Sequence, residues 1–130
     1  MNPPMVLLER SFVAALVDPA DPAHAVAARC YLDLVAEFAR DERLLTVTSD
    51  TRREFGDAIE SLLAPATTLH VAGQERHAAE HVSLDGVGDD ADADLALNLV
   101  LLCRHRIASV ATFDERYAAF DVEVVPGFEY

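Results

Sequence analysis

The sequence MVLLERSFVAALV, residues 5–17, places an acidic side chain between an apolar run and a helical segment. Residues 5–9 form an apolar run that ends in an acid, which is typical of a buried parallel strand presenting a side chain at its carboxyl end. The segment RSFVAALV has the composition of a short helix, and the prolines of DPADP, residues 18–22, end it. The stretch therefore predicts a strand followed at once by a helix, with Glu9 at the junction.

Strands and helices are predicted to alternate along the rest of the chain. Apolar residues at helical spacing predict an amphipathic helix over residues 23–40, and the β-branched run LLTVTS predicts a strand over residues 44–49. Further helices are expected at residues 51–63, 74–82, 95–106 and 115–120, strands at 107–114 and 122–126, a connection with a short strand or turn at 64–73, and an exposed loop at 83–90. This alternation predicts an α/β fold of three layers, with a central, mostly parallel sheet and helices on both faces.

The composition limits the class of protein. With 130 residues, 52% of them hydrophobic, and only five glycines, the chain is expected to form one domain over residues 1–130. Its longest apolar run, residues 95–103, is far shorter than the ~20 residues of a membrane span, and no signal peptide is recognisable. These features favour a cytoplasmic protein that does not enter a membrane. Cys30 and Cys103 lie in apolar, helical surroundings and are expected to be buried free thiols.

The charge of the chain bears on its partners. Its formal net charge of −13 would repel nucleic acid, because phosphate binding depends on Lys and Arg. A role in nucleic-acid binding therefore needs bound cations or a local basic patch.

Four acidic residues are candidates for one site. Glu9 and Asp114 follow predicted strands, whereas Glu54 and either Asp94 or Asp92 lie near the starts of predicted helices. In an open α/β sheet, ligands gather beyond the carboxyl ends of the strands, where the strand order reverses. Close carboxylates repel one another unless a cation neutralises them, and oxygen-only sites suit Mg²⁺ or Mn²⁺. One or two such ions could activate water and stabilise a phosphoryl transition state.

Three segments carry a resemblance to a known family. They are VLLERSFVAALVDPADPAH, TSDTRREF and DADLALNLVLLCRHRIASVATFDERYAAFDVEVVP, which together span nearly the whole chain. In this combination and order, the chain resembles a PIN domain, the metal-dependent ribonuclease fold of the VapC-type toxins of bacterial toxin–antitoxin pairs. The resemblance implies a Mg²⁺- or Mn²⁺-dependent endoribonuclease that forms a homodimer and is bound by an antitoxin along its active groove.

The resemblance also implies roles for individual residues. The metal-binding acids fall on Glu9, Glu54, Asp94 and Asp114, with Asp92 as the alternative to Asp94. Ser11 and Thr112 take the places of hydroxyl residues that orient these acids, and the neighbouring arginines Arg10, Arg52, Arg53 and Arg116 are candidates for RNA phosphate contacts.

Two positions depart from the family pattern. Glu9 stands where Asp is usual, and its additional methylene is expected to push the carboxylate outward. Tyr117 stands where Phe is more usual. Glu9 and the negative net charge motivate a second hypothesis, a catalytically weak or inactive PIN fold that acts by binding RNA or protein.

Each candidate acid also has a purely structural alternative. Glu54 could be the partner of Thr51 in a capping box, Asp114 could cap a short helix, and Glu9 could pair with Arg10 or Arg53. The remaining aspartates, Asp89 and Asp90, are expected to carry charge near a helix N-terminus.

Two further metal motifs are weak. Residues 90–94 imitate the first ligands of an EF-hand, but Leu95 stands where the loop needs Gly and Leu101 where it needs Glu, which excludes that calcium site. Residues 77–81 match the zinc motif H-x-x-E-H without an accompanying ligand motif, so an exposed helix surface is the favoured interpretation.

Overall fold

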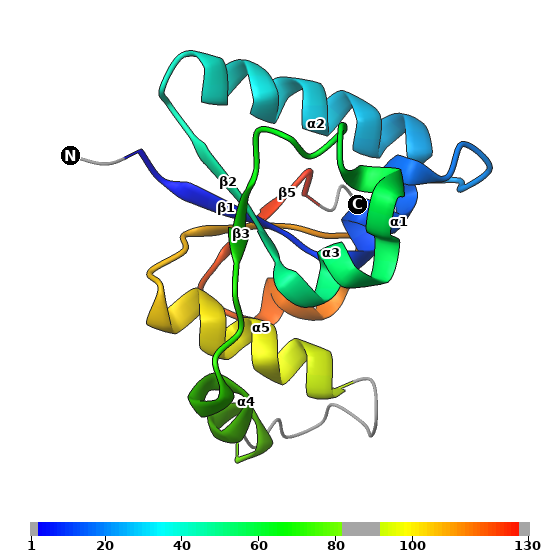
Figure 1. The fold of residues 1–130 in the computed structure, drawn as a ribbon. Coiled ribbons are helices and arrows are strands. Elements are labelled where there is room, and N and C mark those ends of the chain that lie inside the picture. Colours follow the sequence, from blue (N-terminus) through cyan, green and yellow to red (C-terminus); the bar gives the residue numbers. More distant parts are fainter. Residues whose placement is uncertain (1–2, 82–91, 128–130) are drawn as a thin grey trace.

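The computed structural model describes residues 3–81 and 92–127, with the backbone alone described for Asp92 (Figure 1). In chain order the elements are β1 (Met5–Leu8), α1 (Arg10–Val17), α2 (His24–Ala39), β2 (Leu44–Thr48), α3 (Ser49–Phe55), the 3₁₀ helix η1 (Gly56–Ile59), β3 (Thr67–Leu69), α4 (Gly73–Glu80), α5 (Asp92–Arg104), β4 (Ser109–Ala111), the 3₁₀ helix η2 (Glu115–Ala119) and β5 (Glu123–Val125).

The five strands form one sheet in the order β3-β2-β1-β4-β5, and every neighbouring pair is parallel. β1 lies at the centre: Val6 is opposite Leu45 of β2 on one side and Ser109 of β4 on the other. The chain thus builds outward from β1 in one direction and returns to add β4 on the opposite side. The strand order reverses between β1 and β4, which makes their carboxyl ends the expected place for a ligand.

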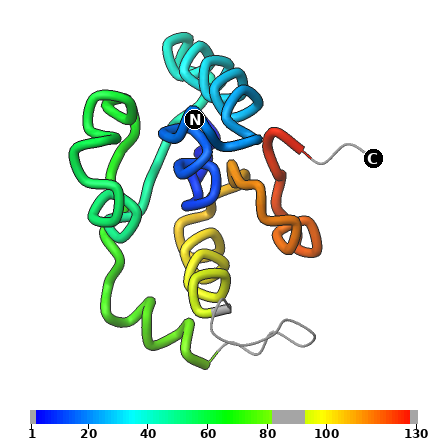
Figure 2. The backbone as a smooth tube through the Cα atoms, turned by 90° about the vertical axis from the view of Figure 1, so that its right-hand side faces the viewer, coloured from blue at the N-terminus to red at the C-terminus, as the bar shows by residue number. Residues whose placement is uncertain are grey.

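Helices cover both faces of the sheet. Figure 2 shows α2 (cyan) and α5 (yellow) on opposite sides of the strands. Because side chains alternate along a strand, Val6 and Leu8 face α1 and α2, whereas Leu7 faces α5. The predicted three-layer α/β fold is confirmed, with a sheet that is parallel throughout.

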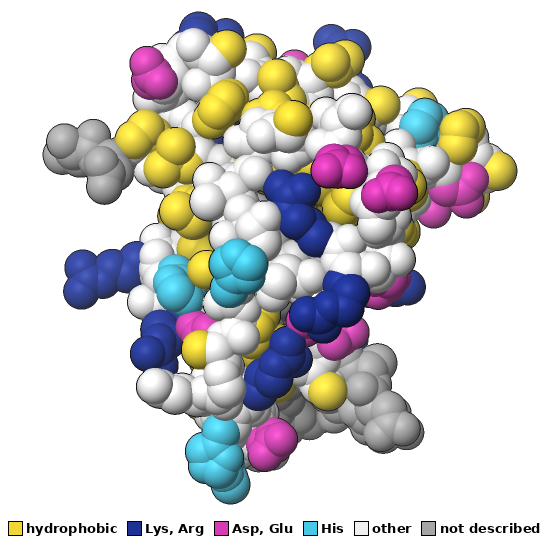
Figure 3. All heavy atoms as spheres, viewed as in Figure 1, with side chains coloured by type: hydrophobic (Ala, Val, Ile, Leu, Met, Phe, Trp, Pro, Cys, Tyr) yellow, Lys and Arg dark blue, Asp and Glu magenta, His cyan; other side chains and the backbone are white. Residues whose placement is uncertain are grey.

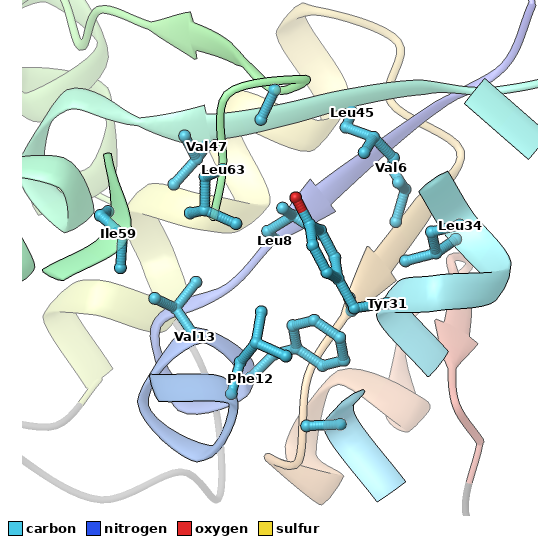
Figure 4. Close-up of a cluster of buried hydrophobic side chains, with 14 of the residues drawn as sticks. Val6, Leu8, Phe12, Val13, Tyr31, Leu34, Leu45, Val47, Ile59 and Leu63 are labelled. Carbon is cyan, nitrogen blue, oxygen red and sulfur yellow. The ribbon is translucent and has the colours of Figure 1, made fainter. Parts of the chain in front are cut away.

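The larger core lies between the sheet and α1 and α2. Phe12 of α1 and Tyr31 of α2 pack with strand residues such as Val6, Leu8 and Leu45 (Figure 4). The buried Tyr31 hydroxyl donates to the carbonyl of Leu62 at 2.5 Å, so its polar atom is satisfied. On the other face, Leu95 and Leu102 of α5 pack with Leu7, Val110 and Tyr117. Both cores hold fixed the strands whose ends carry Glu9 and Asp114.

The helix predicted at residues 51–63 differs from the structure at both ends. α3 begins at Ser49, two residues earlier than expected, because Thr48 accepts a hydrogen bond from the Thr51 amide at 3.2 Å and caps the helix. It ends at Phe55, because Gly56 has φ +54°, a conformation that leaves the α-helix. The chain continues as η1. The predicted capping box between Thr51 and Glu54 is therefore wrong, and the Glu54 carboxylate has another partner.

Other boundaries show smaller differences. α5 begins at Asp92 rather than Leu95, the short helix at residues 115–120 is the 3₁₀ helix η2, and the ambiguous region 64–73 contains the edge strand β3.

Both thiols are free, but the burial predicted for them is wrong: Cys30 is half-buried and Cys103 is exposed. The predicted loop at residues 83–90, with Asp89 and Asp90, lies outside the described residues. None of the described helices is long and apolar enough to cross a membrane.

Candidate active site

Two predicted site acids follow the neighbouring strands β1 and β4. Glu9 comes after β1 and Asp114 lies three residues after β4, and Leu8 is paired with Ala111 in the sheet. The Glu9 amide donates to the Ala111 carbonyl at 2.9 Å, which continues the strand pairing to the edge itself. Both residues thus lie at the switch point of the sheet, as their positions after strands predicted.

The Glu9 carboxylate is buried and held by three donors. Only 8% of the residue is exposed. Its Oε1 accepts hydrogen bonds from the Ser11 amide at 3.0 Å, the Ser11 hydroxyl at 2.5 Å and the Thr112 hydroxyl at 2.6 Å. A buried carboxylate requires such donors, because desolvation penalises its charge. Glu9 is also the N-cap of α1, because its side chain accepts from the Ser11 amide.

The two hydroxyls are oriented by the backbone that follows β4. The Phe113 amide donates to Ser11 Oγ at 2.9 Å, and the Asp114 amide donates to Thr112 Oγ1 at 3.0 Å. Each hydroxyl has one proton. Because each hydroxyl oxygen accepts from an amide, both hydroxyl protons can be donated to Glu9. The two hydroxyl oxygens lie 3.1 Å apart, and no proton is then shared between them. Ser11 and Thr112 therefore fix the position of Oε1.

Asp114 is paired with a nearby arginine. Its carboxylate accepts from Arg116 Nε at 3.0 and 3.1 Å and from Arg116 Nη2 at 2.7 Å, and it also caps η2 through the Arg116 amide. The Arg116 side chain, by this hydrogen bonding, holds the pKa of Asp114 below its usual value. The predicted capping role of Asp114 is thus present, and it leaves the residue ionised at the edge of the sheet.

Glu54 of α3 is paired with Arg10 of α1. Arg10 Nε lies 2.6 and 2.8 Å from the two carboxylate oxygens. This hydrogen bond is the main cause that raises the pKa of Arg10, and the charges of Glu9 and Asp94 contribute. Arg10 thus lies within the electrostatic influence of three predicted site acids. The predicted pairing of Glu9 with Arg10 is present only as this longer-range attraction.

The third acid of the predicted set lies on α5. The Asp94 side chain is exposed and acts on Arg10 through its charge, so it belongs to the same region as Glu9 and Glu54. The side chain of Asp92 lies outside the described residues.

One contact at this edge was missed by sequence reasoning. Asn98 of α5 donates to the Tyr117 hydroxyl at 2.8 Å, and Tyr117 is only 1% exposed. Burial, followed by the charge of Glu9, raises the pKa of Tyr117, so the phenol stays protonated. The sequence contains one signal for this contact, because Asn98 interrupts the apolar run 95–103.

The acids fit a hard cation by their chemistry, since every donor is an oxygen. Their positions fit it less well. Within residues 3–81 and 92–127, no group of three or more His, Cys, Asp or Glu side chains is close enough to hold one ion. Instead, Arg10 and Arg116 neutralise Glu54 and Asp114. The structure thus brings the acids to one edge without forming a coordination shell.

The other predicted phosphate contacts differ in their surroundings. Arg52 Nη2 donates to the carbonyls of Leu63 and Ala66 at 3.3 and 2.9 Å, so this guanidinium braces the chain after η1. The Arg53 side chain is 76% exposed.

His77 and His81 of the H-x-x-E-H motif lie on the surface of α4 with ring centroids 4.7 Å apart, and the described residues provide no third ligand for them.

No protein-family model and no curated protein sequence matches the chain. Solved structures do match it. VapC20 of Mycobacterium tuberculosis, a Sarcin-Ricin loop cleaving toxin, has a TM-score of 0.65 at 17% identity, over 88% of this chain and 93% of that chain. The chain has the VapC fold. VapBC2 of Rickettsia felis, solved with a DNA fragment from its promoter, gives a TM-score of 0.60 at 6% identity, over 92% of this chain and 96% of that chain.

The VapC fold is the PIN-like fold that the resemblance in the sequence implies, so the predicted fold is confirmed. At these identities the shared feature is the backbone arrangement. Within this VapC fold, Glu9 and Asp114 lie beyond the carboxyl ends of the neighbouring strands β1 and β4, and Glu54 and Asp94 lie on the helices α3 and α5.

Proposed function

We propose that the protein is a metal-dependent endoribonuclease, the toxin of a toxin–antitoxin pair. The observation that carries this proposal is the buried Glu9 carboxylate, fixed by Ser11 and Thr112 at the switch point of the sheet, next to Asp114. Burying a charge without a counter-ion costs free energy, and an acid needed only to cap α1 could be exposed. A positioned carboxylate at this place is better explained by a ligand that it must meet.

In this proposal Glu9, Glu54, Asp114 and Asp94, or Asp92 in its place, hold Mg²⁺ or Mn²⁺. The bound ion would supply an activated water and stabilise the charge that develops on an RNA phosphodiester. Glu9 would use Oε2, since the three hydrogen bonds described above all end on Oε1. Ser11 and Thr112 keep that carboxylate from rotating.

Arginines beside the acids would bind the phosphates of the RNA. Arg116 and Arg10 lie next to Asp114 and Glu54, and Arg53 is the most exposed of the candidate arginines on α3. Arg52 is not part of this set, because its guanidinium donates to the backbone carbonyls of Leu63 and Ala66. Arginine suits this role, because its planar guanidinium matches two phosphate oxygens at once.

The same proposal covers the partners. VapC20 is named as a toxin that cleaves the Sarcin-Ricin loop, and VapBC2 was solved with promoter DNA. We call the edge of the sheet that carries Glu9 and Asp114 the acidic edge. By analogy we propose an RNA substrate, a cognate antitoxin that binds along this acidic edge, a homodimer, and action in the cytoplasm. The ion pairs of Arg10 and Arg116 also motivate a second candidate, a binding module without efficient catalysis, because they neutralise Glu54 and Asp114 without a metal.

Cleavage of an RNA panel in Mg²⁺, in Mn²⁺ and in chelator distinguishes the two candidates. We expect cleavage only with metal, reduced more than about 100-fold in Glu9→Gln and Asp114→Asn. Asp121→Asn is the matched control, because Asp121 is an exposed aspartate after η2 and outside the site. If the wild-type protein binds RNA but neither metal supports cleavage, the enzyme proposal fails and the binding module is favoured.

A further inference from the structure

Three arginines on adjacent helices form a row that begins at the candidate site. Arg10 of α1, Arg53 of α3 and Arg76 of α4 make up this arginine row. Figure 3 shows dark blue arginine side chains across the face on which α3 and α4 lie in Figure 1. Arg76 was not among the sequence-derived candidates, because it lies far along the chain from any site acid.

Ion pairs connect the row from one helix to the next. Arg10 pairs with Glu54 of α3, and Arg76 Nη2 of α4 lies 2.6 Å from Asp50 Oδ1, also on α3. Asp50 and Glu54 are one helical turn apart, so they lie on the same side of α3. The row therefore runs without interruption from α1, beside Glu9, across α3 to α4.

The part of the row on α3 and α4 has more positive than negative charge. Asp50 is shared, since Arg53 Nη1 also approaches its Oδ1, at 3.6 Å. One carboxylate cannot neutralise two guanidinium groups, so Arg53 and Arg76 exceed Asp50 by one charge. Arg10, by contrast, is paired with Glu54 and also feels the charges of Glu9 and Asp94. In a chain with net charge −13, such a local excess is the basic patch that binding to an anionic polymer requires.

The guanidinium groups of the row are accessible. The side chains of Arg10, Arg53 and Arg76 are 54%, 76% and 45% exposed. Exposed ion pairs of this kind contribute little free energy, so a phosphate can replace the carboxylate partner at small cost. The side chain of Arg40, at the carboxyl end of α2, is 59% exposed as well. It differs from the arginine row in having its own acidic partner, Glu42.

We propose that single-stranded RNA binds along the arginine row, with its phosphates on Arg53 and Arg76, and extends from the acidic edge across α3 onto α4. This inference rests on the proposed function for its choice of RNA, since the row starts at the site where RNA would be cut. Phosphate contacts of this kind position the strand and do not select its sequence. Arg76 and Asp50 thereby become determinants of substrate affinity.

The test is fluorescence anisotropy with a short fluorescein-labelled RNA of mixed sequence, measured in chelator over a series of salt concentrations. Arg53→Ala and Arg76→Ala should each weaken binding roughly three- to tenfold. Each should also lower the slope of log affinity against log salt by about 0.7, the value for one lost phosphate contact on a single strand. Arg40→Ala is the matched control and should leave both quantities at their wild-type values.

A second variant acts in the opposite direction. Asp50→Asn removes the carboxylate that competes with phosphate for two arginines, so RNA affinity should rise, whereas Glu42→Gln should change nothing. A merely structural ion pair would give no such gain. Thermal unfolding of each variant verifies that it is folded at the temperature of the binding measurement.

The outcomes separate this inference from the proposed function. Reduced RNA binding in Arg53→Ala and Arg76→Ala supports the binding of RNA along the arginine row even if no metal supports cleavage. Wild-type affinity and salt slope in both variants, an equal loss in Arg40→Ala, or no binding of RNA to the wild-type protein at low salt would overturn it. The inference would also be overturned if Arg53→Ala and Arg76→Ala lost affinity for duplex DNA and retained their affinity for RNA.

Discussion

Glu9 folds back onto the start of α1 instead of extending from the sheet. Its side chain accepts from the Ser11 amide, which is the contact that an N-cap side chain makes with the first turn of a helix. The hydroxyls of Ser11 and Thr112 then bind the same oxygen. A residue that departs from the family pattern is thus accommodated by the local hydrogen bonds, and its carboxylate stays at the edge of the sheet.

Thr112→Val tests whether these hydroxyls position Glu9 for a cation. The variant removes one donor to Glu9 and one acceptor from the Asp114 amide, so Mn²⁺ affinity should fall about 10–100-fold, as is typical when a residue that orients a metal ligand is lost. Calorimetric titration measures this affinity. Thr46→Val is the control, because Thr46 is equally buried and donates to the Thr67 carbonyl far from the site. Equal Mn²⁺ affinity in the two variants would contradict the role of Thr112.

Arg10→Ala tests whether Arg10 competes with a metal for Glu54. Removing the guanidinium frees the Glu54 carboxylate and leaves Glu9 and Asp94 without its charge, so Mn²⁺ affinity should rise. Because this ion pair is half-exposed, the expected gain is only about two- to fivefold. Arg40→Ala is the matched control, since Arg40 Nε contacts both Glu42 oxygens in the same way. A fall in Mn²⁺ affinity in Arg10→Ala would show that Arg10 supports the site instead.

Sequence reasoning reached these residues unevenly. Glu9 and Asp114 could be found because strand ends are visible in the apolar pattern. The Arg10–Glu54 pair could not, because its members are 44 positions apart and no local pattern links them. The local alternative, a capping box with Thr51, was plausible from spacing alone and is wrong.

α3 shows how one glycine sets the length of an element. The capping-box spacing of Thr51 and Glu54 predicts a helix to residue 63, but Gly56, with φ +54°, ends the α-helix after Phe55. The bend directs the chain into η1 and then to β3. A propensity argument treats Gly as a weak cost within a helix, and only the tertiary path of the chain shows that it is a terminator.

Gly56→Ala should therefore destabilise the protein by about 1–3 kcal/mol, since an L residue is strained in this conformation whatever the space around it. Urea unfolding monitored by circular dichroism measures the change. Gly73→Ala is the control, because no atom lies near its added Cβ and no positive φ is required there. The expected result for Gly73→Ala is unchanged or slightly raised stability. Similar losses in both variants would contradict the explanation for the end of α3.

α4 is attached to α5 through a buried carboxylate. Glu75 is 2% exposed and accepts from the Ala72 amide at 2.8 Å and from His105 Nε2 at 2.7 Å, with Arg104 Nε at 3.6 Å. Burial alone would raise the pKa of Glu75. The Ala72 amide, His105 and Arg104 outweigh this effect and hold the pKa of Glu75 below its usual value. Glu75 thus ties α4, the far end of the arginine row, to the core.

Glu75→Gln should lower the free energy of unfolding by about 1–3 kcal/mol at neutral pH. Because the folded pKa of Glu75 is depressed, its stabilisation is present above the unfolded value of about 4.3 and is lost as pH falls through the folded value. The difference between wild type and variant should therefore shrink on acidification, as measured by urea unfolding at several pH values. Glu80→Gln, at an exposed position of the same helix, should have little effect. A pH-independent difference for Glu75→Gln would exclude this origin of the stability.

Across the chain, the period of the apolar residues was sufficient for the order of elements and the three layers. β3 stayed ambiguous because it is a three-residue edge strand with no buried side chain, which leaves little pattern to detect. The parallel sheet then determines the site, because it brings the carboxyl ends of β1 and β4 to one edge from opposite ends of the chain. Which side chains meet there depends on χ angles and ion pairs that no sequence pattern encodes.

Calorimetric titration of Mn²⁺ into the wild-type, Glu9→Gln, Asp114→Asn and Asp121→Asn proteins tests whether the acidic edge holds a catalytic cation. Saturable binding is expected in the wild type and in Asp121→Asn, with affinity reduced more than about tenfold in Glu9→Gln and Asp114→Asn. No saturable binding by the wild-type protein, or equal binding by all four proteins, would contradict the assignment of these acids to a metal site.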